Sequence, residues 1–163
     1  MIPLIIPVKK HEENKQQLLD LIEQSETSDV VEGDDRISRC DFHMPQDHPK
    51  IYFKLFYETV KEDLIQAFNF LQYDGSLVNW WFQQYNHNDQ HGWHFHTQTV
   101  YSITYYLELP EGLGTQVRIP PSMAEFQAMV KEGDMLIIPS TWKHRSPVNH
   151  TNQRKTIIAL DIG

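Results

Sequence analysis

The chain has little cysteine, little basic charge and no long apolar run, and each shortage excludes a class of protein. Cys40 is the single cysteine among 163 residues, so no intrachain disulfide can form and we expect the reducing cytoplasm as the compartment. Only 14 residues are lysine or arginine against 22 acidic ones, which gives a net charge of −8. This balance argues against a general binder of nucleic acid or anionic membrane, because both need a basic face.

The apolar stretches are too short to cross a bilayer. The first of them is broken by Pro3 and Pro7 and lacks the positive segment of a signal peptide, so we expect a first β-strand there and no membrane partner. No repeat, linker or low-complexity segment divides the chain. The sequence therefore predicts one domain over residues 1–163.

Helical spacing is confined to the first half of the chain. Residues 9–27 carry a narrow apolar stripe, and residues 52–72 carry a strong one that ends at Asp74-Gly75. Residues 28–50, with Gly33 and two prolines, predict a loop with a short strand or two. We therefore expect residues 1–75 to form a helical and strand support.

After Gly75 the pattern changes to period two with strand-forming residues and frequent turn signals. The predicted strands are Leu77–Tyr85, Val100–Leu109, Thr115–Ile119, Met135–Pro139 and Lys155–Ile162. Short strands at this spacing are typical of a sandwich or barrel. The sequence predicts a mainly β fold with N-terminal helices, whose core at 76–163 is a double-stranded β-helix, or jelly roll.

Nine histidines are many for this length, and two of them form the motif His94-Phe95-His96. On a strand, residues i and i+2 lie on one face, about 6–7 Å apart along the chain, so both imidazoles can converge on one metal ion. Neutral imidazole suits iron, zinc, copper and nickel. The third ligand we expect is His144, which follows the apolar strand 135–138 and Pro139 near a barrel mouth.

Two further residues are candidates for binding an anion beside this metal. Arg154 opens the last strand and shares a face with Ile158 and Leu160, which predicts that its guanidinium points into the barrel and needs an anionic partner there. The alternative is a strand-end arginine that pairs with an acidic residue in solvent. Tyr85 could donate a hydrogen bond to the same anion or be an ordinary barrel tyrosine, and Trp93 and Tyr101 are candidates for a substrate pocket.

These motifs in this order resemble the jelly-roll Fe(II)/2-oxoglutarate-dependent oxygenases, in particular small members from marine bacteria and their phages. The resemblance spans residues 78–162 and uses Trp80-Trp81, the H-x-H motif, Tyr105-Tyr106, Gly133-Asp134, His144 and Arg154. It implies Fe(II) at His94 and His144, and 2-oxoglutarate with its distal carboxylate on Arg154 and a hydrogen bond from Tyr85. The implied reaction is hydroxylation of a small molecule or a peptidyl side chain such as proline, with ascorbate as a candidate reductant.

His96 departs from the family pattern, because most members carry aspartate or glutamate there. Three neutral imidazoles leave more positive charge on the ion, and His96 could also be replaced as ligand by water or by His91 or Asp89. Two other functions stay open on the residues alone. One is a cupin-like metalloenzyme that does not use 2-oxoglutarate, and the other is a non-catalytic jelly-roll binding protein.

Overall fold

The computed structural model describes residues 3–45 and 47–163. Two helices lie in the first half of the chain, α1 (His11–Glu23) and α2 (Phe53–Leu71). The strands are β1 (Leu4–Pro7), β2 (Ser28–Glu32), β3 (Asp35–Cys40), β4 (Leu77–Tyr85), β5 (His91–His94), β6 (Tyr101–Glu108), β7 (Gln116–Ile119), β8 (Ala124–Gln127), β9 (Asp134–Pro139), β10 (His144–Ser146) and β11 (Lys155–Ile162).

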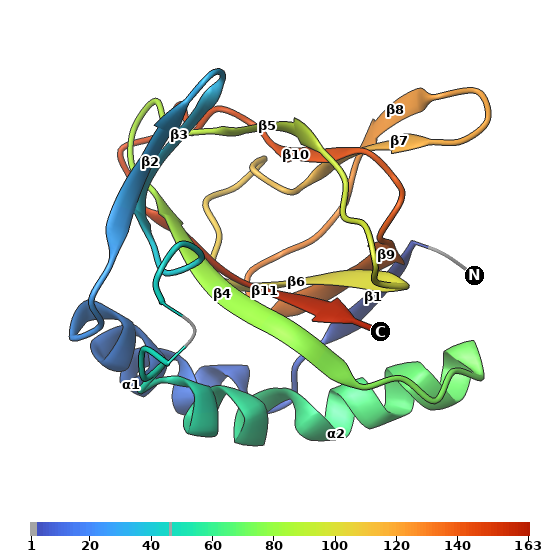
Figure 1. Ribbon diagram of the computed structural model, residues 1–163, viewed down its shortest axis with the longest axis horizontal. Coiled ribbons are helices and arrows are strands. Elements are labelled where there is room, and N and C mark those ends of the chain that lie inside the picture. The colour runs from blue at the N-terminus through green and yellow to red at the C-terminus, as the bar shows by residue number, and fades with distance from the viewer. Residues whose placement is uncertain (1–2, 46) are drawn as a thin grey trace.

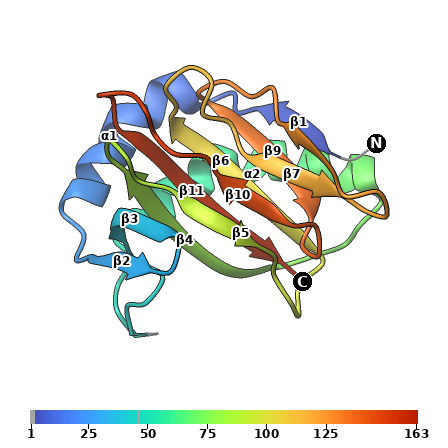
Figure 2. The same cartoon turned by 90° about the horizontal axis from the view of Figure 1, so that it is seen from above.

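The strands form two antiparallel sheets that face each other. The major sheet has the order β1-β9-β6-β11-β4-β3-β2, and the minor sheet has the order β5-β10-β7-β8. Both helices cover the outer face of the major sheet, while the minor sheet lies over its inner face (Figures 1 and 2). The predicted double-stranded β-helix with N-terminal helices is therefore confirmed.

Two apolar cores follow from this layering. The first lies between the helices and the major sheet and contains Leu18, Ile22, Phe56, Val60, Phe82, Ile158 and Leu160. The second lies between the two sheets and contains Trp81, Tyr85, Leu136, Ile138, Ile157 and Ala159. Because both faces of the major sheet are covered, all eight residues of β11 are buried.

The predicted elements agree closely with the observed ones. The helical patterns at 9–27 and 52–72 are α1 and α2, and the predicted strands Leu77–Tyr85 and Lys155–Ile162 match β4 and β11 to the residue. The short strands β8 and β10 were not predicted. Both have four residues or fewer, so neither is long enough to show a period-two pattern.

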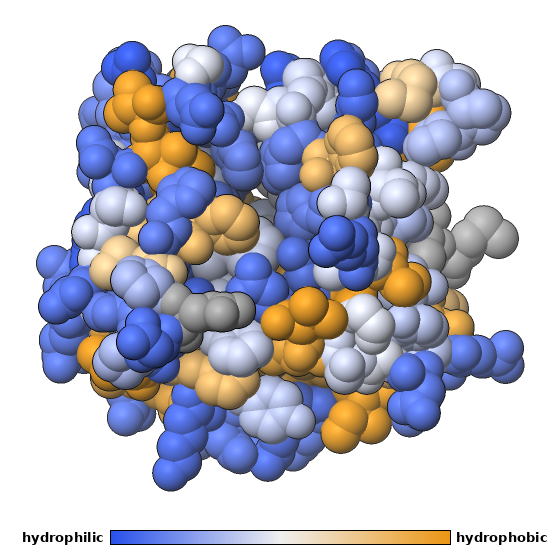
Figure 3. Space-filling model, viewed as in Figure 1, coloured by the Kyte–Doolittle hydropathy of each residue, from blue (hydrophilic) through white to orange (hydrophobic). Residues whose placement is uncertain are grey.

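The surface in the view of Figure 1 is largely hydrophilic, with apolar residues in scattered groups (Figure 3). Such scatter is normal for a folded protein and marks no single docking face in this view. Over residues 3–45 and 47–163, no helix has both the length and the apolar character needed to span a membrane.

Candidate metal centre

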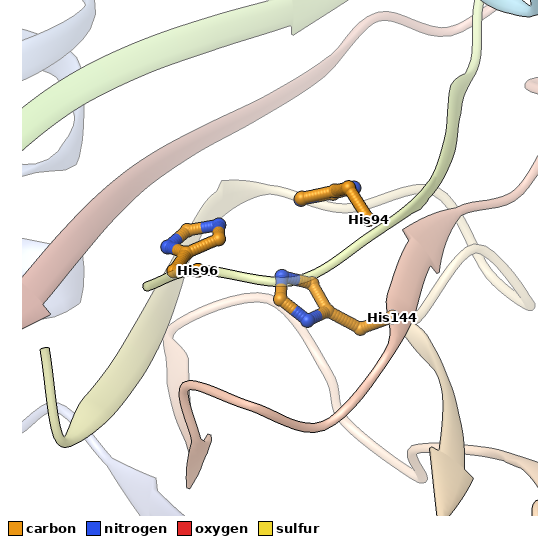
Figure 4. Close-up of side chains that lie close together, drawn as sticks. All are labelled: His94, His96 and His144. Carbon is orange, nitrogen blue, oxygen red and sulfur yellow. The ribbon is translucent and has the colours of Figure 1, made fainter. Parts of the chain in front are cut away.

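The minor sheet brings the three predicted histidines together. His94 ends β5, His96 follows it, and His144 begins β10, which pairs with β5 so that His144 lies opposite His94. One ring nitrogen of each histidine lies within 4.8 Å of one from each of the other two. The three rings surround a common space in Figure 4, and one ion could bind all three there.

Backbone carbonyls fix the orientation of two of these rings. Nδ1 of His94 lies 2.8 Å from the carbonyl oxygen of Gly92, and Nδ1 of His144 lies 2.9 Å from that of Trp142. Since a carbonyl only accepts hydrogen bonds, each Nδ1 carries the proton and donates. Nε2 of each ring is therefore unprotonated and free to bind a metal.

His96 is fixed in the same way by a carboxylate. Its Nδ1 lies 2.6 Å from Oδ1 of Asp161 on β11 and 3.0 Å from Oγ of Ser102 on β6. The carboxylate accepts the Nδ1 proton, so Nε2 of His96 is also free. All three histidines thus present the same nitrogen to one point.

Burial favours the neutral form of two of these imidazoles, the form in which histidine binds metals. It lowers the pKa of His144 to about 3, with a smaller lowering by the nearby His94. The pKa of His94 is lowered as well, again chiefly by burial. A preformed set of three oriented imidazoles fits a divalent transition metal well.

The two alternative third ligands do not fit. His91 stacks on His94 with 3.8 Å between ring centroids, and it is not one of the residues whose ring nitrogens converge. Asp89 is buried beneath the loop after β4, where its Oδ2 accepts hydrogen bonds from the backbone of Asn86 and the hydroxyl of Ser38. His96 is therefore the ligand that the geometry favours.

An inner cavity between the sheets extends from the histidines to a lysine. Lys155 is 1 % exposed, and its Nζ donates to the carbonyl of Leu113 at 2.7 Å and to Oγ of Ser146 at 2.8 Å. In the described part of the chain no carboxylate lies within ion-pair distance of it. Burial lowers the pKa of Lys155 to about 7. A buried ammonium without an anion is unfavourable, which points to an anionic ligand in this cavity.

Tyr85 lines the same cavity. Its side chain is buried, its hydroxyl donates to Oε1 of Gln83 at 2.7 Å, and Nζ of Lys155 lies 5.4 Å from its ring centroid. Burial raises the pKa of the Tyr85 hydroxyl well above its usual value, so the group remains a hydrogen-bond donor at neutral pH.

Arg154 does not reach the cavity, and the prediction that it points into the barrel is wrong. Its Nε donates to Oε1 of Glu108 at 2.8 Å, its Nη1 lies 3.8 Å from Glu23 of α1, and its side chain is 37 % exposed. The face it shares with Ile158 and Leu160 packs on the helices, not on the minor sheet. The alternative of a strand-end arginine paired with acidic residues is what the structure has.

The two aromatic residues proposed for the substrate pocket also lie elsewhere. Trp93 neighbours His94 on β5, so its side chain takes the opposite face, where Arg118 and Arg145 lie 4.0 and 4.8 Å from its ring centroid. Tyr101 packs against Tyr73 and the helix-side core. Alternation along β5 explains the first error and the covering helices explain the second.

An outer pocket of about 410 Å³ adjoins the histidines. Its lining shares His91, His94, His96, Trp81 and Gln83 with the inner cavity. Other aromatic and polar side chains complete it, among them Phe42, Phe95, Asn79 and Asp35. The sequence did not single these residues out as a pocket, because they come from separate strands and loops. The site thus has an inner cavity that contains Lys155, a three-histidine centre and an outer pocket.

Several solved structures are similar to this chain along nearly its whole length. The chain is similar to an oxidoreductase of the 2OG-Fe(II) oxygenase family from Burkholderia pseudomallei, with a TM-score of 0.76 and 10% identity over 98% of this chain and 84% of the other. It is also similar to a prolyl hydroxylase from Trichoplax adhaerens in complex with a hypoxia-inducible-factor peptide, with a TM-score of 0.68 and 15% identity over 97% and 82%.

A third similar structure is the epimerase SnoN in complex with Fe³⁺, α-ketoglutarate and nogalamycin RO. Its TM-score is 0.73 at 10% identity, over 98% of this chain and 78% of the other. No protein-family model and no curated protein matches the sequence. At such low identities the likeness establishes the fold alone: the chain shares its double-stranded β-helix with these proteins.

Proposed function

We propose that this protein is an Fe(II)- and 2-oxoglutarate-dependent oxygenase that hydroxylates a small molecule or a peptidyl side chain. The observation that carries the proposal is the buried Lys155, an ammonium without a carboxylate partner among the described residues, in a cavity lined by the three converging histidines. A metal centre and a buried cation side by side fit a ligand that chelates the metal at one end and carries a carboxylate at the other. 2-Oxoglutarate is such a ligand.

Each part of the site has a role in this proposal. His94, His96 and His144 would hold Fe(II) through Nε2, and Lys155 would pair with the distal carboxylate of 2-oxoglutarate in place of Arg154. The protonated Tyr85 hydroxyl would donate a further hydrogen bond to the cosubstrate. When bound, iron would supply the redox chemistry by which O₂ converts 2-oxoglutarate to succinate and CO₂ and hydroxylates a C–H bond.

The outer pocket would receive the primary substrate. Its lining includes His94 and His96 but not Lys155, so cosubstrate and substrate need not compete for the space around Lys155. The inner cavity, by contrast, holds only about 30 Å³. A five-carbon dicarboxylate is larger than that, so we expect side chains around Lys155 to move when it binds.

Release of succinate tests the proposed activity without knowledge of the substrate. Purified protein with Fe(II), ascorbate and 2-oxoglutarate should form succinate slowly in air, since cosubstrate oxidation can proceed uncoupled. The product can be measured by mass spectrometry, with oxalate instead of 2-oxoglutarate as a matched blank. If the protein formed no more succinate than the metal-free control at every pH from 6 to 8, the assignment would be contradicted.

The lowered pKa of Lys155 predicts a pH dependence of cosubstrate binding. In the protein without 2-oxoglutarate, the Lys155 side chain is mostly charged below about pH 7. Above this pH its charged fraction falls as pH rises. The dissociation constant of 2-oxoglutarate should therefore increase about tenfold per pH unit between pH 7 and 9. Calorimetric titration of the Mn(II)-loaded protein measures it, and binding at pH 8 should take up a proton from the buffer. An affinity that stays constant from pH 6.5 to 9 would show that Lys155 does not pair with the carboxylate.

A further inference from the structure

Asp161 is a buried carboxylate that accepts hydrogen bonds from one histidine and from the serine beside it. It lies on β11, on the same inter-sheet face as Lys155 and Ala159, and its side chain is 12% exposed. Oδ1 lies 2.6 Å from Nδ1 of His96 and 3.2 Å from Oγ of Ser102. No lysine or arginine within the described ranges pairs with it. A buried carboxylate in such surroundings is unfavourable unless another positive charge compensates it.

His96, in contrast to a carboxylate ligand, brings no negative charge to the metal. Three neutral imidazoles give a bound divalent ion no negative charge, whereas two histidines and a carboxylate give it one. Asp161 supplies one negative charge next to this very ligand, through the Nδ1–H of His96. The metal and the carboxylate would therefore compensate each other across the imidazole ring.

We propose that Asp161 is a positioning residue for the metal centre. Through its hydrogen bond with His96 it supplies the negative charge that a carboxylate ligand would have provided. The inference rests on the proposed metal site. A carboxylate that accepts Nδ1–H fixes the tautomer and the ring orientation, and makes Nε2 a stronger donor to the metal. Asp161 itself is not among the residues whose ligand atoms converge, so it acts through His96.

The major sheet holds this carboxylate in place before any metal arrives. Asp161 is paired in register with Ser102 of β6 and with Asn79 of β4. The Ser102 hydroxyl lies between Asp161, His96 and the Ser140 hydroxyl, at 3.2, 3.0 and 3.3 Å. His96 is further anchored by its backbone N–H, which donates to the carbonyl of Ser140 at 2.9 Å. The arrangement is thus built into three strands and a loop, and does not depend on an ion.

The test is metal affinity, measured by competition with a chromophoric chelator using Zn(II) and Mn(II), in wild-type protein and in Asp161→Asn. Asparagine keeps the shape and the hydrogen-bond acceptor but removes the charge. We expect binding about 10- to 100-fold weaker. Asp134→Asn is the matched control, because Asp134 is equally buried but accepts its hydrogen bond from the turn before β9; its affinity should stay within about twofold.

A second background separates charge from structure. In His96→Asp the third ligand carries its own charge, so adding Asp161→Asn should leave affinity unchanged or improve it, since two carboxylates then repel each other. Equal losses in both backgrounds, or no loss in either, would overturn the proposal. If Asp161→Asn does not fold, Ser102→Ala tests the same link, with a several-fold loss that is absent in His96→Asp. Failure of the wild-type protein to bind either ion would instead refute the metal site.

Discussion

Replacing His144 with alanine should abolish metal binding. The His144 side chain is almost fully buried, its ring is held by the Trp142 carbonyl, and its Nε2 faces His94 and His96. Removal leaves two ligands from a single segment, which cannot surround an ion. Because loss of residues that merely orient a ligand already weakens binding 10- to 100-fold, we expect loss of the ligand itself to cost roughly 100-fold or more.

The measurement is metal content after equilibrium dialysis against Fe(II) under argon, together with succinate release. Wild-type protein should hold one ion per chain, and His144→Ala almost none. His150→Ala is the control, since His150 is exposed in the loop between β10 and β11, outside the cluster of three histidines. Equal metal content in His144→Ala and wild type would refute the three-histidine centre.

Replacing Lys155 with methionine should abolish 2-oxoglutarate binding, whereas the same change at Arg154 should not. Methionine retains most of the apolar stem of lysine but removes the ammonium. Truncating one partner of a buried charge pair costs about 2–5 kcal/mol, and at about 1.4 kcal/mol per tenfold this is roughly 30-fold or more in affinity. Arg154 contacts Glu108 and Glu23 near the protein surface, so its loss should change affinity less than about twofold.

Adjacent positions make this pair a sharp comparison. Both variants lose one positive charge at adjacent positions, Arg154 directly before β11 and Lys155 at its first residue, so the change in net charge is matched. Calorimetric titration of Mn(II)-loaded protein at pH 6.5, where Lys155 is charged, gives both affinities. If Arg154→Met lost binding and Lys155→Met retained it, the sequence-based assignment to Arg154 would stand and the structural one would fall.

The difference between Arg154 and Lys155 shows what period-two reasoning can and cannot decide. Alternation correctly placed Ile158 and Leu160 of β11, and Arg154 directly before the strand, on one side of the sheet. It could not decide which face looks into the barrel, because helices cover one side and the minor sheet covers the other, and both sides are apolar. One signal in the sequence did indicate the other face: Lys155 begins a strand whose remaining residues are mostly apolar, and its side chain points to the side opposite Arg154.

The outer pocket illustrates a second limit. Its lining comes from β2 and β3, the loop after β3, β4 and the segment after β5, which are distant in sequence. No local pattern joins them. Trp93 was a candidate for the substrate pocket because it is next to His94 in the sequence. Neighbouring residues on a strand point to opposite faces, so its side chain lies away from the histidines. The residues that adjoin the metal ligands in space are set by sheet pairing instead.

The sequence by itself determined the helices, the longer strands, the jelly-roll fold and the three histidines, because each depends on local periodicity or on a motif with a fixed spacing. Only the tertiary structure decided that Lys155 and not Arg154 lines the cavity with the histidines, that Asp161 contacts His96, and which residues form the outer pocket. These depend on which of two buried faces of one sheet meets which neighbouring layer. That choice is made by long-range packing of helices and strands, and no short segment contains it.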